Sequence, residues 1–229
     1  AANGIETPRL MLLSAQDGAP DGIGNRSDQV GRNLMDHPGT TVEFEMPEPV
    51  WPGRGPQEGT SILKFRDGDH RRDFAAKKLH LWNGSAVAGV AQEAIEEGLT
   101  GDELRRTVRD RAARRCAINN FHEQLPDPAN RLTLSEGQTD PLGLARPSIH
   151  YEIGDYVRRS AKHTAEVYRD IVDRLGARAI SVGDGSDGFA PNNHIMGATI
   201  MGNDPTNSVV DGTCRTHDHD NLYVASSSV

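Results

Sequence analysis

The sequence is poor in the features that mark several classes of protein. It has only two cysteines among 229 residues, with no second Cys or His at metal spacing, which argues against a disulfide scaffold or a zinc site. No apolar run approaches the roughly 20 residues of a membrane span. Leu, Ile, Val and Phe make up only about a fifth of the chain, at the border between folded and disordered compositions. Either the protein is loose and polar or its core lies partly in a longer polypeptide, and periodic segments along the chain favour the second.

Basic character is also missing. The net charge is -8 and the pI is about 5.6, so we expect no nucleic-acid partner. A Gly-x-Ser-x-Gly elbow, a Walker loop and a His-Glu-x-x-His pattern are all absent, which leaves hydrolase interpretations with little support. We also expect no dinucleotide-binding turn in this chain. No signal peptide is visible and the chain does not begin with Met, so we expect its beginning to be cut or processed.

Hydrophobic periodicity predicts a mixture of helices and strands. The clearest helix covers 155–175, opened by Asp155 and ended by Gly176. A short helix is expected from Thr7, as its cap, and Pro8, and one or two helices are expected over 90–115 with a break at 98–101. Strands are expected over 41–45, 61–65, 116–124, the end of 125–135, 148–153, 179–182 and 221–225. The mixture favours an α+β or α/β class, between which periodicity does not choose.

The densest polar cluster is 192–202, Asn-Asn-His-Ile-Met-Gly-Ala-Thr-Ile-Met-Gly. Oxidation of an alcohol by hydride transfer needs a base for the hydroxyl proton, and a neutral imidazole is a suitable base for that task. The cluster supplies one at His194. A single His is nevertheless structural or merely exposed in roughly three cases of four. A second His-rich stretch, 214–220, lacks a third ligand at a characteristic distance, so no metal site is expected.

Several separate segments resemble the glucose-methanol-choline (GMC) oxidoreductase family. The stretch Gly-Ile-Glu-Thr-Pro-Arg-Leu at 4–10, with Ser14, resembles the second signature of that family, and departs from it at Asn3, Gly4 and Ala15. The other segments that resemble the family, in order along the chain, are 31–38, 123–134, 194–202, 209–211, 214–215 and 221–228. They cover both ends and the middle of the chain.

The resemblance implies an α+β (α/β) fold. A GMC-type substrate-binding domain with a mostly antiparallel sheet and helices would occupy 41–185. Residues 1–40 and 186–229 would be incomplete remnants of the Rossmann-like FAD-binding domain, the second of them carrying the catalytic His.

The resemblance also assigns roles to individual residues. His194 matches the catalytic histidine, which takes the substrate hydroxyl proton while hydride goes to flavin N5. Ala225 and Ser226 match the stretch that touches the ribityl and pyrophosphate part of FAD. The remaining candidates are Asn193 near the substrate and, as cofactor-binding residues in a loop near FAD, Asn33, Asp36 and His37.

The implied activity is oxidation of a CH–OH group of a sugar, sugar acid or polyol by an FAD-dependent dehydrogenase. Segments 52–58, 65–68 and 192–197 look closest to bacterial gluconate and sorbitol dehydrogenases. These imply a cytochrome c electron-acceptor subunit, a small subunit, and a periplasmic location peripheral to the inner membrane. Two alternatives stay open: a non-catalytic binding or structural module derived from this fold, and an alcohol oxidase that uses oxygen.

The same resemblance predicts that this chain is incomplete. The amino-terminal FAD-binding fold and a second catalytic His or Asn, expected beyond Val229, would lie outside it. We therefore expect the isolated chain to bind FAD weakly and to turn over no substrate. Flavin that co-purifies with the chain at a ratio near one to one would contradict this.

Overall fold

The computed structural model describes residues 3–229, and contacts divide the chain into two compact units. Unit 1 contains the residues up to His37, Gln124–Ile153 and Pro191–Val229, whereas unit 2 contains Pro38–Glu123 and Gly154–Ala190. The division differs from the expected boundaries chiefly in Gln124–Ile153, which joins the two terminal segments rather than the middle of the chain. The assignment of these segments to cofactor and substrate domains stays a prediction.

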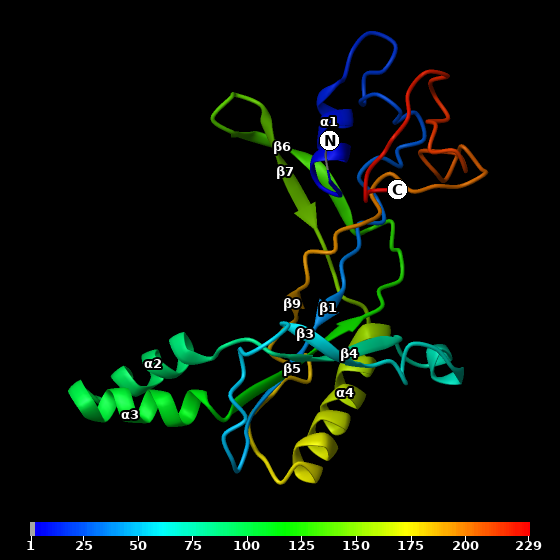
Figure 1. The fold of residues 1–229 in the computed structure, drawn as a ribbon. Helices are drawn as coiled ribbons and strands as arrows, with labels where there is room; N and C mark the ends of the chain where they lie inside the picture. The colour runs from blue at the N-terminus through cyan, green and yellow to red at the C-terminus, as the bar shows by residue number, and fades with distance from the viewer. Residues whose placement is uncertain (1–2) are drawn as a thin grey trace. The chain divides into compact units, whose positions relative to one another are not determined.

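Unit 2 is built on a five-stranded sheet in the order β3-β4-β5-β2-β8, whose neighbouring strands all pair antiparallel (Figure 1). This confirms the expected α+β class with antiparallel sheets. Rossmann-like remnants at the two ends of the chain stay a prediction. The strands of the sheet are β2 (Thr41–Glu45), β3 (Glu58–Ile62), β4 (Lys77–Trp82), β5 (Arg115–His122) and β8 (Arg178–Val182).

Helix α4 (Asp155–Arg174) covers one face of this sheet because its buried side chains repeat at helical spacing. The ring of Tyr168 is fully buried, and its hydroxyl donates a hydrogen bond of 3.0 Å to the carbonyl oxygen of Thr40. The core between helix and sheet consists of Val42, Phe44, Leu79, Ile118, Tyr168 and Val172. The helix matches the predicted one, although Gly154 rather than Asp155 is its N-cap.

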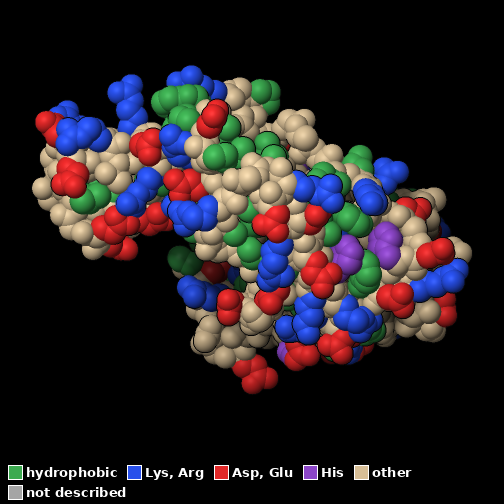
Figure 2. All heavy atoms as spheres, turned by 90° about the horizontal axis from the view of Figure 1, so that it is seen from below, with side chains coloured by type: hydrophobic (Ala, Val, Ile, Leu, Met, Phe, Trp, Pro, Cys, Tyr) green, Lys and Arg blue, Asp and Glu red, His purple; other side chains and the backbone are tan. Residues whose placement is uncertain are grey.

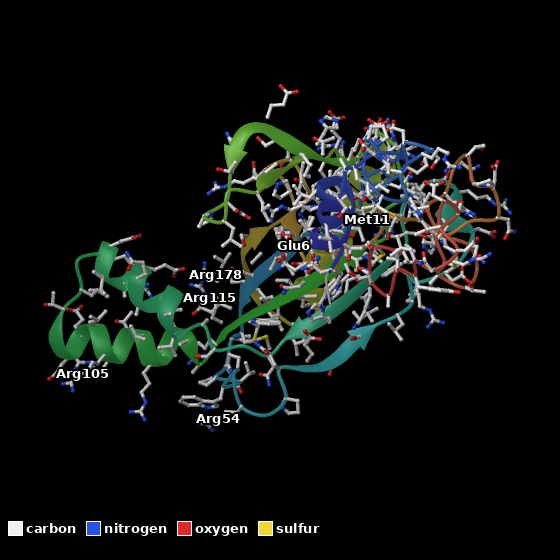
Figure 3. All side chains as sticks on the ribbon, turned by 90° about the horizontal axis from the view of Figure 1, so that it is seen from above. Glu6, Met11, Arg54, Arg105, Arg115 and Arg178 are labelled. Carbon is white, nitrogen blue, oxygen red and sulfur yellow. The ribbon has the colours of Figure 1, made fainter. Side chains whose placement is uncertain are left out.

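A helical pair, α2 (Val87–Glu96) and α3 (Gly101–Ala112), is attached to the sheet by an ion pair. Arg115, at the start of β5 and labelled in Figure 3, donates to both carboxylate oxygens of Glu93 on α2, at 3.0 and 2.6 Å. The side chain of Arg115 is 12% exposed and that of Glu93 is 45% exposed, so solvent reaches the pair from the Glu93 side. The hydrogen bonds from Arg115 hold the pKa of Glu93 below its usual range.

Unit 1 contains few regular elements. Helix α1 (Glu6–Leu13) and the hairpin of β6 (Arg131–Thr139) and β7 (Ala145–His150) are its main ones, and 15–37 and 192–229 are largely irregular. Its core joins Met11, Val30, Val209, Val210 and Val224. The remaining short elements of the chain are β1 (Pro38–Gly39), β9 (Ala190–Pro191) and the 3-10 helix η1 (Asp69–Arg72).

Two local predictions were wrong, and one strand was missed. Helix α1 begins at Glu6, before the expected cap Thr7, because the side-chain oxygen of Asn3 accepts the N–H groups of Ile5 and Glu6. The segment 221–225 is not a strand and forms only one isolated bridge, between Tyr223 and Arg215. Strand β4 was not predicted at all.

The expected lack of a dinucleotide-binding turn needs a correction. Residues 183–188 read Gly-Asp-Gly-Ser-Asp-Gly, a Gly-x-Gly-x-x-Gly match directly after β8. Such a turn binds a pyrophosphate only where a parallel strand leads into a helix N-terminus. Here β8 pairs antiparallel with β2 and the chain continues into β9, so the match occurs without the required structure.

The surface gives no sign of charge segregation in the view of Figure 2, where acidic and basic side chains are interspersed. Within residues 3–229, no helix combines the length and apolar character needed to cross a membrane.

Lys77 of β4 is the main buried cation of unit 2, with only 2% of the residue exposed. Its Nζ donates to the carbonyl oxygen of Ser160 at 3.1 Å and lies 2.7 Å from Nδ1 of His163. The rings of Phe65 and Phe74 lie 5.3 and 5.0 Å from it. Burial lowers the pKa of Lys77 to about 7, against the opposing effect of the Glu166 charge.

This burial predicts a pH dependence of stability. Because the folded pKa of Lys77 lies below its ordinary value of 10.5, the unfolded chain takes up the proton first as the pH falls. Above about pH 10.5, Lys77 is neutral in both the folded and the unfolded chain and does not lower the free energy of unfolding. As the pH falls toward about 7, the unfolded chain binds the proton and the folded chain does not, so the free energy of unfolding decreases. We expect the urea midpoint of the wild type to fall relative to that of Lys77→Met across this window. A midpoint difference between the wild type and Lys77→Met that is independent of pH would contradict this.

Candidate active site

Three chain segments that are distant in sequence lie side by side in unit 1. The N–H groups of Met35 and Met196 each donate to the other residue's carbonyl oxygen at 2.9 Å, so 31–35 pairs with 196–198. On its other side, 31–35 pairs with 130–132, where Leu132 N–H donates to the oxygen of Gly31 at 2.9 Å. These hydrogen bonds form a frame, defined here as 31–35, 130–132 and 196–198, which positions the polar residues at 36–37 and 192–194.

The frame depends on glycine at two points of close approach. A Cβ on Gly197 would lie 1.9 Å from the carbonyl oxygen of Asn33, and one on Gly31 would lie 2.1 Å from that of Leu132. Both glycines have positive φ, 76° and 91°, which side chains disfavour. Asn33 is itself at φ 61° and is buried. The segment therefore packs with its backbone, rather than its side chains, against 196–198.

The carboxylate of Asp36 accepts four backbone hydrogen bonds. Oδ1 accepts the N–H groups of His37 at 2.7 Å and of His194 at 2.8 Å. Oδ2 accepts those of Asn192 at 3.2 Å and of Asn193 at 3.1 Å. Three consecutive N–H groups converge in this way because Asn193 adopts φ 58°, a left-handed conformation that Asn tolerates. We call residues 192–194 the His194 turn.

Asp36 is held in its turn by Tyr151. The N–H of Asp36 donates to the hydroxyl oxygen of Tyr151 at 3.1 Å, and that hydroxyl donates to Oε1 of Gln124 at 2.8 Å. Burial raises the pKa of Tyr151, so the hydroxyl keeps the proton with which it donates. Backbone and side chain of Asp36 are thus both fixed.

The two histidines whose backbone N–H groups bind Asp36 also bring their imidazole rings close together. The rings of His37 and His194 are 5.5 Å apart, edge to face at 83°, and the side-chain amide of Asn192 donates to the carbonyl oxygen of His37 at 2.6 Å. His194 is exposed whereas His37 is half-buried. An exposed neutral imidazole on a fixed backbone can accept a proton from a hydroxyl group that reaches it.

The comparisons with known proteins identify the family. Residues 126–229 match the model of a family described as GMC oxidoreductase, and the whole chain is 46% identical to the fructose dehydrogenase large subunit of Gluconobacter japonicus. The chain belongs to the GMC oxidoreductase family. It is also 27% identical, over its whole length, to a 2-methyl-1,2-propanediol dehydrogenase of Mycolicibacterium austroafricanum. It spans 41% and 42% of the lengths of these two relatives.

A solved structure supports the fold. A formate oxidase variant of Aspergillus oryzae RIB40 matches 99% of this chain and 48% of its own with a TM-score of 0.66 at 15% identity. The likeness concerns the architecture alone. It agrees with the mixed α+β class described for this GMC oxidoreductase chain.

The structure brings four of the predicted site residues together and leaves others apart from them. Asp36, His37, Asn193 and His194 share the contacts described above. Ser226 has other partners, since its Oγ accepts from the hydroxyl of Thr7 at 2.7 Å and from the N–H of Ser228 at 3.2 Å. Ala225 is exposed. Of the predicted residues, Asn33, Asp36 and His37 precede the part of the chain that matches the GMC family model.

Sequence reasoning missed Tyr151. It follows β7 in the sequence, 115 residues from Asp36, and no local pattern distinguishes it from other exposed or half-buried tyrosines. Its neighbour in the structure, Gln124, belongs to a segment that resembles the GMC family, but the contact between the two could not be predicted from either residue.

The close approach at Gly197 gives a prediction. Gly197→Ala places a methyl group against the Asn33 carbonyl and forces a left-handed alanine, a conformation that by itself costs about 1–3 kcal/mol. We expect the frame to open and the midpoint of thermal unfolding to fall clearly. Gly212→Ala is the matched control, because a Cβ there meets nothing within 4 Å. Equal midpoints for the two variants would contradict the frame described here.

Proposed function

We propose that the protein containing this chain is an FAD-dependent dehydrogenase that oxidises a CH–OH group of a sugar, sugar acid or polyol. Membership of the GMC oxidoreductase family supports the reaction class. The similarity to a protein named fructose dehydrogenase large subunit, over the whole chain, supports a sugar or polyol substrate.

The observation that carries this proposal is the exposed imidazole of His194 beside His37, on a turn that Asp36 holds by three hydrogen bonds. In the proposed reaction His194 removes the substrate hydroxyl proton. The ring of His37, 5.5 Å from that of His194, would orient the same hydroxyl group, and Asn193 stays a candidate near the substrate because it belongs to the same turn as His194. FAD, when bound, supplies the acceptor for the hydride that leaves the carbon atom.

Among the residues proposed to contact FAD, those at 225–228 are suited to binding a large ligand. Residues 225–228 are Ala-Ser-Ser-Ser, with Ala225 and Ser227 exposed, so small side chains leave the backbone open to close approach by the ribityl and pyrophosphate groups. Asn33 is buried, and both oxygens of Asp36 already accept hydrogen bonds. This supports a role for these two in shaping the site rather than in touching the cofactor.

We also propose that the protein works with further subunits, because the relative at 46% identity is by name a large subunit. A cytochrome c subunit as electron acceptor, a small subunit, and a periplasmic location peripheral to the inner membrane complete the proposal by resemblance to the gluconate and sorbitol dehydrogenases.

The test is a panel of sugars, sugar acids and polyols offered to the full-length protein with an artificial dye as acceptor. His194→Ala should lower the turnover of the best substrate by about 10²–10⁴-fold, the usual contribution of a general base, at unchanged flavin content. His150→Ala removes an exposed histidine of β7 in the same unit and should have no effect. Near-normal turnover by His194→Ala would refute the assignment. Oxygen consumption without dye would instead indicate an oxidase.

A further inference from the structure

We propose that Asp36 is a positioning residue, which acts on the reaction through His194 and makes no contact with the cofactor. The inference rests on the proposed function, in which His194 is the base. It differs from the role expected from the sequence, where Asp36 belongs to a loop near FAD.

The geometry of the carboxylate supports this role. A single oxygen, Oδ1, accepts the N–H groups of both His37 and His194, at 2.7 and 2.8 Å. The two histidines are 157 positions apart in sequence, and this oxygen is the atom that joins their backbones. Because only the Cβ atom separates each ring from the backbone so fixed, the carboxylate also limits where the two rings can lie.

An ionised carboxylate meets the requirements of this position and an amide does not. The four N–H groups need an acceptor with lone pairs on both oxygens and no hydrogen of its own. Hydrogen bonds from backbone N–H groups to a carboxylate are also roughly twice as strong as neutral ones. In Asp36→Asn, an NH₂ group replaces one carboxylate oxygen. This group is a donor, so the two N–H groups that face it lose their acceptor and are placed against another donor.

The backbone of the His194 turn is shaped to receive an anion. Its three successive N–H groups point to one side because Asn193 is left-handed, an arrangement that forms a concave site for an anion. Asp36 is the anion in that site. Without it, Asn192, Asn193 and His194 lose the hydrogen bonds that hold this conformation.

The experiment is a double-mutant cycle in the full-length, flavin-loaded protein, read as the rate of flavin reduction by a saturating substrate. We expect Asp36→Asn to slow reduction by about 10- to 100-fold, the effect of misplacing a catalytic group by about 1 Å. The KM should change much less, and flavin content should be unchanged. In the His194→Ala background, the same substitution should cost less than about twofold, because residues that act as a unit are not additive.

Two results would overturn the inference. One is an equal slowing by Asp36→Asn in both backgrounds, which would mean that Asp36 acts independently of His194. The other is loss of flavin from Asp36→Asn, which would mean that Asp36 serves the cofactor. A fully active His194→Ala would be a different failure, since it would remove the proposed function itself.

Two further variants complete the experiment: one controls for the loss of a carboxylate elsewhere, and the other disturbs Asp36 without removing its carboxylate. Asp204→Asn is the matched control, because Asp204 is another aspartate of unit 1 whose carboxylate accepts a backbone N–H group, that of Thr206 at 2.9 Å, away from the frame; it should leave the rate unchanged. Tyr151→Phe removes the hydroxyl that accepts the Asp36 N–H and keeps the carboxylate. It should slow reduction a few-fold in the wild type and not in His194→Ala, so it decides the question if Asp36→Asn does not fold. Equal slowing in both backgrounds would again overturn the inference.

Discussion

Four backbone N–H groups directed at one carboxylate are the interaction on which the rest of the candidate site depends. The groups come from His37 and from the His194 turn, which enter unit 1 from widely separated parts of the chain. Each N–H would otherwise need water or another partner. Because Asp36 accepts all four, it links the backbone of His37 to that of His194. The exposed ring of His194 and the half-buried ring of His37 lie next to each other on these two linked segments.

The frame that carries these two segments is held together by backbone hydrogen bonds rather than by an apolar core. Residues 31–35 pair on both edges, and glycines occupy the two points where side chains would collide. Unit 1 consequently contains long irregular segments that are nevertheless well fixed. Unit 2 follows the opposite principle, since an antiparallel sheet and helix α4 bury a contiguous apolar core around Phe44 and Tyr168. Its buried Lys77 is a costly exception, tolerated between Ser160, His163 and two phenylalanine rings.

The sequence was sufficient wherever structure follows from local pattern. Helix α4 and strand β2 were predicted correctly because their apolar positions repeat at the spacing of a helix or a strand. Strand β4, Lys-Lys-Leu-His-Leu-Trp, was missed because two of its buried positions are Lys77 and His80. At the site, His194 was singled out by its polar, glycine-containing context and by family resemblance. The contacts of Asp36 with 192–194 could not be predicted, because they join residues more than 150 positions apart.

The central claim is that Asp36 holds His194 so that its ring faces the reacting group. The most direct measurement is a crystal structure of the full-length protein with its flavin and a non-reacting polyol. The account predicts a ring nitrogen of His194 within hydrogen-bond distance of a ligand hydroxyl, with both oxygens of Asp36 still on the four N–H groups. A His194 ring turned away from the ligand, or an Asp36 carboxylate bonded to the flavin, would contradict it.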